Sequence, residues 1–131
     1  MVKYYFHKLK LAICSFSSPN DKGYVLLTEY PSYIKLHFQL KNLLPGCQEF
    51  SIHEFGDGRN GLENMGRDYF GDPTYIIINN EGICNDVVNF FHLRLDQIIG
   101  RSIVINNSEL KYAYGIIGHC ASNKKIDQNK I

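Results

Sequence analysis

Long apolar runs are missing from this chain, and their absence bears on whether it crosses or is carried across a membrane. The longest, Leu11–Cys14 and Tyr75–Ile78, are far shorter than the ~18 residues needed to cross a bilayer. The N-terminus is basic but has no continuous apolar stretch of the kind that signal peptides carry. We therefore expect no membrane partner and no secretion.

A strong net charge and paired cysteines are also missing. The chain has 14 Lys and Arg against 13 Asp and Glu, so its formal charge is +1 and no bulk field favours nucleic acid. Its cysteines, Cys14, Cys47, Cys84 and Cys120, form no CxxC pair. This spacing argues against a zinc knuckle and a thioredoxin motif, and predicts free thiols.

What is present is short alternation of apolar and polar residues. With 131 residues and 44% hydrophobic composition, the chain is the size of one globular domain. Period-two patterns between Gly, Pro, Asn and Asp clusters predict an all-β antiparallel sandwich or barrel, with no long helix. Gly56–Gly71 has no apolar period and is expected to be loop. The eight expected strands are Lys10–Phe16, Tyr24–Tyr30, Tyr33–Leu40, Glu49–Phe55, Thr74–Asn79, Ile83–Phe91, Gly100–Ile105 and Leu110–Gly118.

Four sequence blocks occur in a familiar order and spacing: Phe50–Asp57, Phe70–Asp72 followed by Gly82, Ile98–Arg101 and Gly115–Gly118. Together they resemble the Cu/Zn superoxide dismutase family, whose fold is an eight-stranded Greek-key sandwich or barrel. The resemblance implies a dismutase-like domain over residues 10–118. Residues 1–9 would then be an N-terminal extension and residues 119–131 a polar tail.

The resemblance also implies that most metal ligands are lost. The family holds copper with four imidazoles, and zinc with three imidazoles and one carboxylate. Copper positions fall here on Ser51, His53 and Asn106, and zinc positions on Tyr69 and Asp72; the remaining ligands belong to a loop that this chain lacks. One imidazole or one carboxylate cannot hold a buried transition metal, so we expect no metal, no cofactor and no catalytic residue.

Two further family features are altered. The positions of the intrasubunit disulfide fall on Leu62 and Tyr114. The electrostatic loop shortens to Asn106–Glu109, and Lys111 stands at the anion-guiding position. These changes point in the same direction as the missing ligands, toward an inactive relative.

The family's dimer contact, by contrast, is retained as an apolar and glycine-rich set. Such a face implies a homodimer, or binding to the copper chaperone for superoxide dismutase, although these residues could serve only the β-scaffold. The shortened loops are similar to those of the catalytically inactive poxviral dismutase-like proteins, which implies a location in the virion and host cytoplasm. The matching positions are Phe55, Gly56, Ile99, Gly100, Ile117 and Gly118.

Two other functions remain open. An active enzyme could use a rebuilt metal site in which His37 or His92 joins His53, Tyr69 and Asp72. A purely structural virion protein would need neither metal nor interface. The simpler interpretations are that His53 is hydrogen-bonded to a neighbour and that Asp72 caps a turn. Ser51 beside His53 lacks the Gly-x-Ser-x-Gly turn that exposes a nucleophile.

Overall fold

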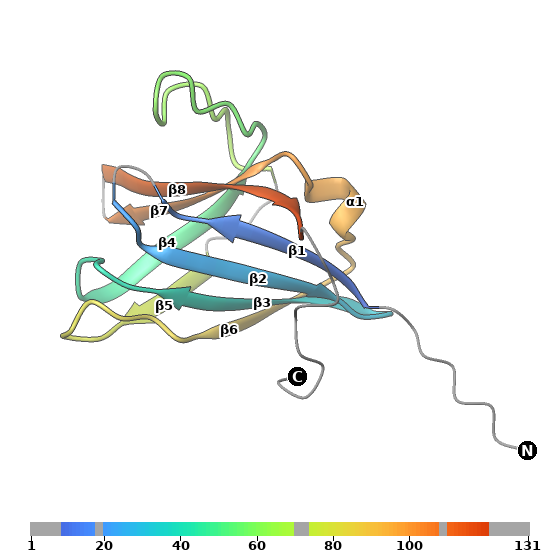
Figure 1. Ribbon diagram of the computed structural model, residues 1–131, viewed down its shortest axis with the longest axis horizontal. Coiled ribbons are helices and arrows are strands. Elements are labelled where there is room, and N and C mark those ends of the chain that lie inside the picture. Colours follow the sequence, from blue (N-terminus) through green and yellow to red (C-terminus); the bar gives the residue numbers. More distant parts are fainter. Residues whose placement is uncertain (1–8, 18–19, 70–73, 108–109, 121–131) are drawn as a thin grey trace, which may run out of the picture.

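One antiparallel sheet contains all eight strands (Figure 1). The computed structural model describes residues 9–17, 20–69, 74–107 and 110–120, without the side chains of residues 107 and 110–112. The order across the sheet is β5-β4-β7-β8-β1-β2-β3-β6. The strands are β1 (Lys10–Ser15), β2 (Gly23–Glu29), β3 (Tyr33–Leu40), β4 (Gly46–His53), β5 (Thr74–Ile78), β6 (Val87–Phe91), β7 (Ser102–Asn107) and β8 (Leu110–His119).

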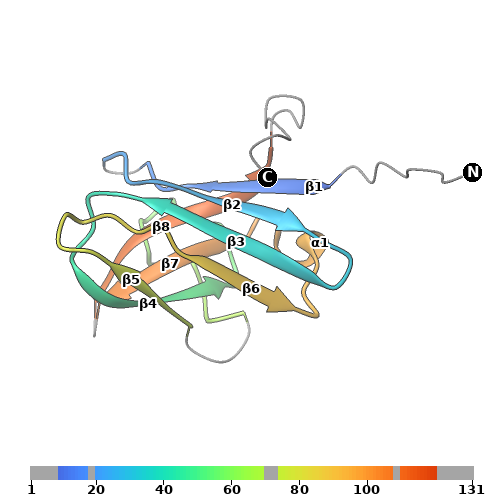
Figure 2. The same cartoon turned by 90° about the horizontal axis from the view of Figure 1, so that it is seen from below.

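The sheet curls into a half-barrel, so its inner face encloses the core (Figure 2). This confirms the all-β prediction and is consistent with the β-barrel fold of the dismutases. Along β3 every second residue is buried, because alternate side chains of a strand point to opposite faces. Phe38 of β3 and Phe50 of β4 meet across the core with ring centroids 4.7 Å apart.

Most expected strand boundaries are within a few residues of the observed ones, and β3 matches at both ends. The prediction was wrong at the end of β4, which stops at His53 rather than Phe55. The reason is that the amides of Glu54 and Phe55 donate to Arg67 and Met65 in the returning loop. The expected start of the sixth strand at Ile83 was also wrong, because only Cys84 there forms an isolated bridge, with Leu40.

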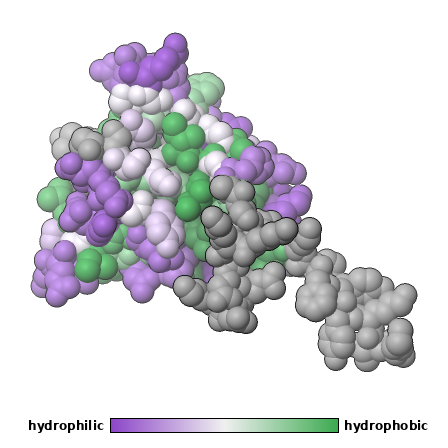
Figure 3. All heavy atoms as spheres, viewed as in Figure 1, coloured by the Kyte–Doolittle hydropathy of each residue, from purple (hydrophilic) through white to green (hydrophobic). Residues whose placement is uncertain are grey.

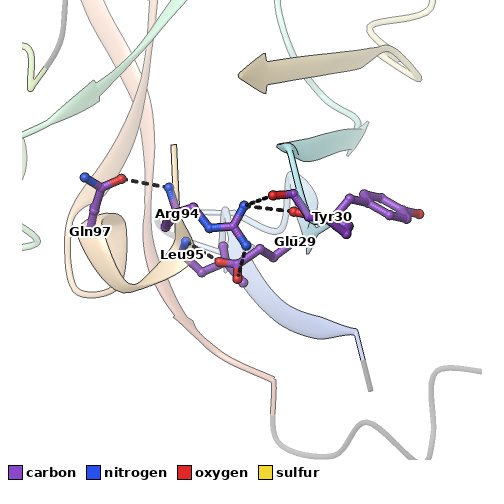
Figure 4. A network of polar contacts seen from close by, with 6 residues as sticks. Glu29, Tyr30, Arg94, Leu95 and Gln97 are labelled. Carbon is purple, nitrogen blue, oxygen red and sulfur yellow. Dashed lines mark hydrogen bonds and ion pairs between the residues drawn. The ribbon is translucent and has the colours of Figure 1, made fainter. Parts of the chain in front are cut away.

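A single helical turn, α1 (Leu95–Ile98), is fixed to the end of β2 by a buried carboxylate (Figure 4). Glu29 accepts hydrogen bonds from the Arg94 guanidinium at 2.6 Å and from the Leu95 amide at 2.7 Å. Arg94 also donates to the carbonyls of Tyr30 and Pro31. Within the described ranges, no helix is long and apolar enough to cross a membrane.

Candidate functional site

The candidate site lies on the outer face of β4 and β7. Phe50 and Ile52 of β4 point into the core, so the alternating residues Ser51 and His53 take the outer face. Asn106 of β7 pairs with Glu49 and lies on the same face, because Ser51 pairs with Val104 two residues earlier. Diagonal neighbours in a sheet are about 7–8 Å apart. The structure therefore gathers Ser51, His53 and Asn106 on one face.

His53 is almost completely buried and has three polar neighbours. Its side chain is 2% exposed, although it points away from the core. Ring atom Nδ1 lies 3.0 Å from the Gly66 carbonyl oxygen, and because a carbonyl only accepts, Nδ1 carries the hydrogen and donates. Ring atom Nε2 lies 3.0 Å from Ser51 Oγ and 3.1 Å from Asp68 Oδ1. The hydrogen-bonded interpretation of His53 is therefore confirmed.

This cluster does not have the geometry of a hydrolytic triad. In a triad, the carboxylate and the nucleophilic hydroxyl occupy opposite nitrogens of the imidazole. Here Ser51 and Asp68 share Nε2, while Nδ1 is bound to the Gly66 carbonyl. The cluster instead fastens the loop to the strand, since Asp68 also forms an isolated backbone bridge with His53.

Arg101 is a second fastening point, and its contacts could not be read from the sequence. Its guanidinium carbon lies 3.6 Å from the centroid of the Tyr69 ring, a cation–π contact. It also donates to the carbonyl oxygens of Glu54 at 2.6 Å and Gln97 at 2.8 Å. The Tyr69 amide in turn donates to the Ile52 carbonyl. Tyr69, expected at a zinc position, thus holds the loop against β4.

Other expected site residues are placed only in part. Asp72 lies outside the described residues, and of Lys111 only the backbone, paired with Asn106, is described. Leu62 is half-buried in the loop. Tyr114 of β8 packs beside the loop, where a Cβ on Gly58 would lie 3.2 Å from its hydroxyl.

All four cysteines are described, and all are free thiols, as the sequence predicts. Burial raises the pKa of the Cys84 thiol to about 11 and that of Cys14 further still. Cys47, by contrast, is exposed at the start of β4. The thiols are therefore separated into a buried pair and a more accessible pair.

The described donors do not fit a dismutase copper centre. One imidazole is available on this face, and both of its nitrogens already have protein partners. Ser51 and Asn106 offer only a hydroxyl and a carboxamide, which are poorer ligands for copper than imidazoles. Asn106 Oδ1 is buried without a hydrogen-bond partner. No group of three or more His, Cys, Asp or Glu occurs in the part of the chain that the structure describes.

A rebuilt site is also not assembled by the described histidines. His37 lies on β3, where its Nε2 is 2.7 Å from Asn85 Oδ1. His92 follows β6 and is exposed. Neither forms a metal-type group of three with His53 among the described residues.

The expected partner face is formed by the end of β4, the turn before β7, and β8. A Cβ on Gly56 would collide with the Gly100 carbonyl and come within 3.0 Å of the Ile116 side chain, so these three residues lie close together. Phe55 is 54% exposed and Ile116 43% exposed. Gly100 has φ +86°, a conformation that favours glycine.

One member of the expected face needs correction. Ile117 is 1% exposed and belongs to the core, because its side chain lies on the inner face of β8 while Ile116 points outward. Ile99 is half-buried and packs against the core, and Gly118 pairs with Ile13 of β1. Hydrophobic residues gather along the middle of the side formed by β8, β1 and β2 (Figure 3). We call Phe55, Gly56, Ile99, Gly100, Ile116 and Gly118 the β8 face.

Comparison with known proteins agrees with the fold and the motifs. No family model matches the chain. The extracellular Cu-Zn superoxide dismutase of Brugia pahangi is 23% identical over 125 residues, covering 81% of this chain. The chain spans 63% of the length of that relative. The half-barrel and this alignment together support a distant relationship to the Cu-Zn superoxide dismutases.

Proposed function

We propose that this chain is a non-enzymatic, dismutase-like binding protein. The supporting observation is the outer face of β4, where His53 is bonded to Ser51, Gly66 and Asp68 rather than facing a set of further imidazoles. Such contacts hold a loop in place without a metal. Binding through the β8 face then replaces chemistry as the function, as in an inactive virion-associated protein of the poxviral type in the host cytoplasm.

Metal loading tests the loss of activity. Purified protein incubated with copper and zinc, then dialysed, is expected to hold far less than one copper per chain and to lack superoxide dismutation. A His53→Ala variant should give the same result, because weak surface binding does not depend on this residue. Stoichiometric copper with dismutase activity that disappears in His53→Ala would overturn the proposal and favour a rebuilt metal site.

Binding experiments test the β8 face. We expect the chain to form a homodimer or to bind the copper chaperone for superoxide dismutase, whose dismutase-like domain offers a similar surface. Phe55→Asp places a charge on an exposed apolar residue of this face and should weaken binding at least tenfold. Tyr75→Asp, an equally exposed residue on β5, is the matched control and should bind normally.

A purely structural virion protein predicts a different outcome. It would bind neither itself nor the chaperone through the β8 face, and Phe55→Asp would leave all measured associations unchanged. Sedimentation and chaperone pull-down together therefore separate binding from a scaffold role.

A further inference from the structure

The two edges of the sheet form a second unusual surface, away from the β8 face. The edge strands are β5, with sequence Thr-Tyr-Ile-Ile-Ile, and β6, with sequence Val-Val-Asn-Phe-Phe. Neither contains a charge or a proline, the residues with which proteins normally prevent edge-to-edge pairing. Tyr75, Ile77, Val87 and Phe91 are each more than half exposed on these two strands.

The β5 edge is partly closed by a side chain. The Ile77 amide points away from β4 and donates to Asp86 Oδ2 at 2.7 Å. Asp86 belongs to the segment before β6, and its backbone carbonyl accepts from Phe38 of β3. A charged residue therefore occupies the β5 edge where an incoming strand would need to pair.

Among the described residues, no side chain closes the β6 edge in this way. Leu40 and Cys84 exchange two backbone hydrogen bonds, and Phe38 donates to Asp86 in the same register. Because hydrogen-bonded pairs alternate along an antiparallel ladder, even-numbered residues of β6 face β3. Val87, Asn89 and Phe91 thus direct their backbone groups outward, and the described residues provide no partner for them.

We propose that β6 pairs with β6 of a second copy, antiparallel and about a two-fold axis at Asn89. In this register Asn89 faces Asn89 of the second copy, and Val87 faces Phe91, so each smaller apolar side chain lies opposite a larger one. All outward backbone groups of the three residues become paired. The proposal does not rest on the proposed function, because it uses the edge strand β6 and none of the residues of the β8 face.

Charge also allows this pairing. Lys35 on β3 is a charged residue close to the axis, because it pairs with Asn89. The two copies of Lys35 would be separated by three strand spacings, about 14 Å, which exceeds the Debye length of about 8 Å at physiological salt. A pair of five-residue strands is a small interface, so we expect a weak dimer with micromolar affinity.

Cysteine crosslinking tests the register. Facing residues of a hydrogen-bonded pair have Cα atoms about 5.5 Å apart, which suits a disulfide. In a Cys47→Ser, Cys120→Ser background, Asn89→Cys should form a covalent dimer with oxidised glutathione at about 100 µM protein. Phe91→Cys is the matched control, because the two Phe91 positions would be offset by four residues, about 14 Å along the strands. It should crosslink at least tenfold more slowly.

Sedimentation equilibrium tests the association itself. Asn89→Glu keeps a favourable cross-strand neighbour in Lys35 but places two carboxylates at the axis, and should weaken self-association at least tenfold. Tyr75→Glu on β5 is its matched control and should have no effect, and circular dichroism checks that both variants fold. A monomer at 500 µM, or equal crosslinking of Asn89→Cys and Phe91→Cys, would overturn the proposal. Dimerisation lost in Phe55→Asp but retained in Asn89→Glu would also overturn it, while supporting the β8 face.

Discussion

Two buried polar clusters fasten loops to this sheet, and they differ in how their charges are compensated. In the first, the Glu29 side chain is 7% exposed and forms an ion pair with Arg94. In the second, the His53 side chain is 2% exposed, and its Nδ1 donates to a neutral carbonyl. Its acidic neighbour, the Asp68 side chain, is half exposed.

The two clusters have different requirements. A buried carboxylate needs its cation, since removing one partner leaves an uncompensated charge. A buried imidazole can be satisfied by hydrogen bonds alone. The first cluster is therefore an ion pair that needs both partners, and the second is a set of hydrogen bonds that needs no cation.

Removing one partner of the Glu29–Arg94 ion pair should give the largest loss of stability. Arg94→Met keeps an apolar stem but leaves Glu29 with only the Leu95 amide as a donor. Fully buried pairs lose about 3–5 kcal/mol when one partner is removed. Because the Arg94 side chain is 40% exposed, we expect about 2–3 kcal/mol of lost unfolding free energy in urea.

The double variant Glu29→Met, Arg94→Met is the control for this prediction. With both charges removed, it should be more stable than Arg94→Met alone, although it lacks both members of the ion pair. If the double variant were less stable than the single variant, Glu29 would not be an uncompensated charge there. The first cluster would then be ordinary packing.

Removing the imidazole should give a smaller and more local effect. His53→Leu keeps the buried volume approximately but loses the hydrogen bond to Gly66, at a cost of about 1–2 kcal/mol. The amides of Glu54 and Phe55, which donate to the returning loop, should exchange with solvent faster. Amide exchange followed by NMR measures this.

Asp68→Asn is the control for this prediction. Because Asp68 is half exposed, the variant should change stability by no more than about 0.5 kcal/mol. Equal losses of stability in His53→Leu and Asp68→Asn would contradict the view that the second cluster does not depend on an ion pair.

The sequence predicted the strands better than either cluster, for physical reasons. Apolar and polar residues alternate along Tyr33–Leu40 because only one face of this strand is buried. That local pattern was enough to predict both ends of β3. Glu29 and Arg94 are 65 residues apart and have no shared local pattern. Asp68 lies in a loop without period, so its contact with His53 depends on how that loop returns. Whether Ile116 or Ile117 points outward could be decided only from the pleat of β8 in the structure.

A third kind of buried ionisable group is a thiol, and its effect on stability appears only at high pH. Burial raises the pKa of Cys84 to about 11, whereas an unfolded thiol ionises near 8.5. The folded state then holds its proton over a pH range where the unfolded state loses it. Stability from this group is complete below about pH 8.5 and is lost as pH rises toward 11.

Comparing the stability of wild type and Cys84→Ala across pH measures the contribution of this thiol. Alanine lowers stability at every pH through lost packing, but the gap between the two proteins should narrow between pH 8 and pH 10 in urea unfolding. At pH 8, iodoacetamide should modify exposed Cys47 long before Cys84, because the thiolate is the reacting form. A gap that stays constant with pH, together with rapid modification of Cys84, would mean that this thiol ionises freely. Burial would then have no effect on the ionisation of the Cys84 thiol.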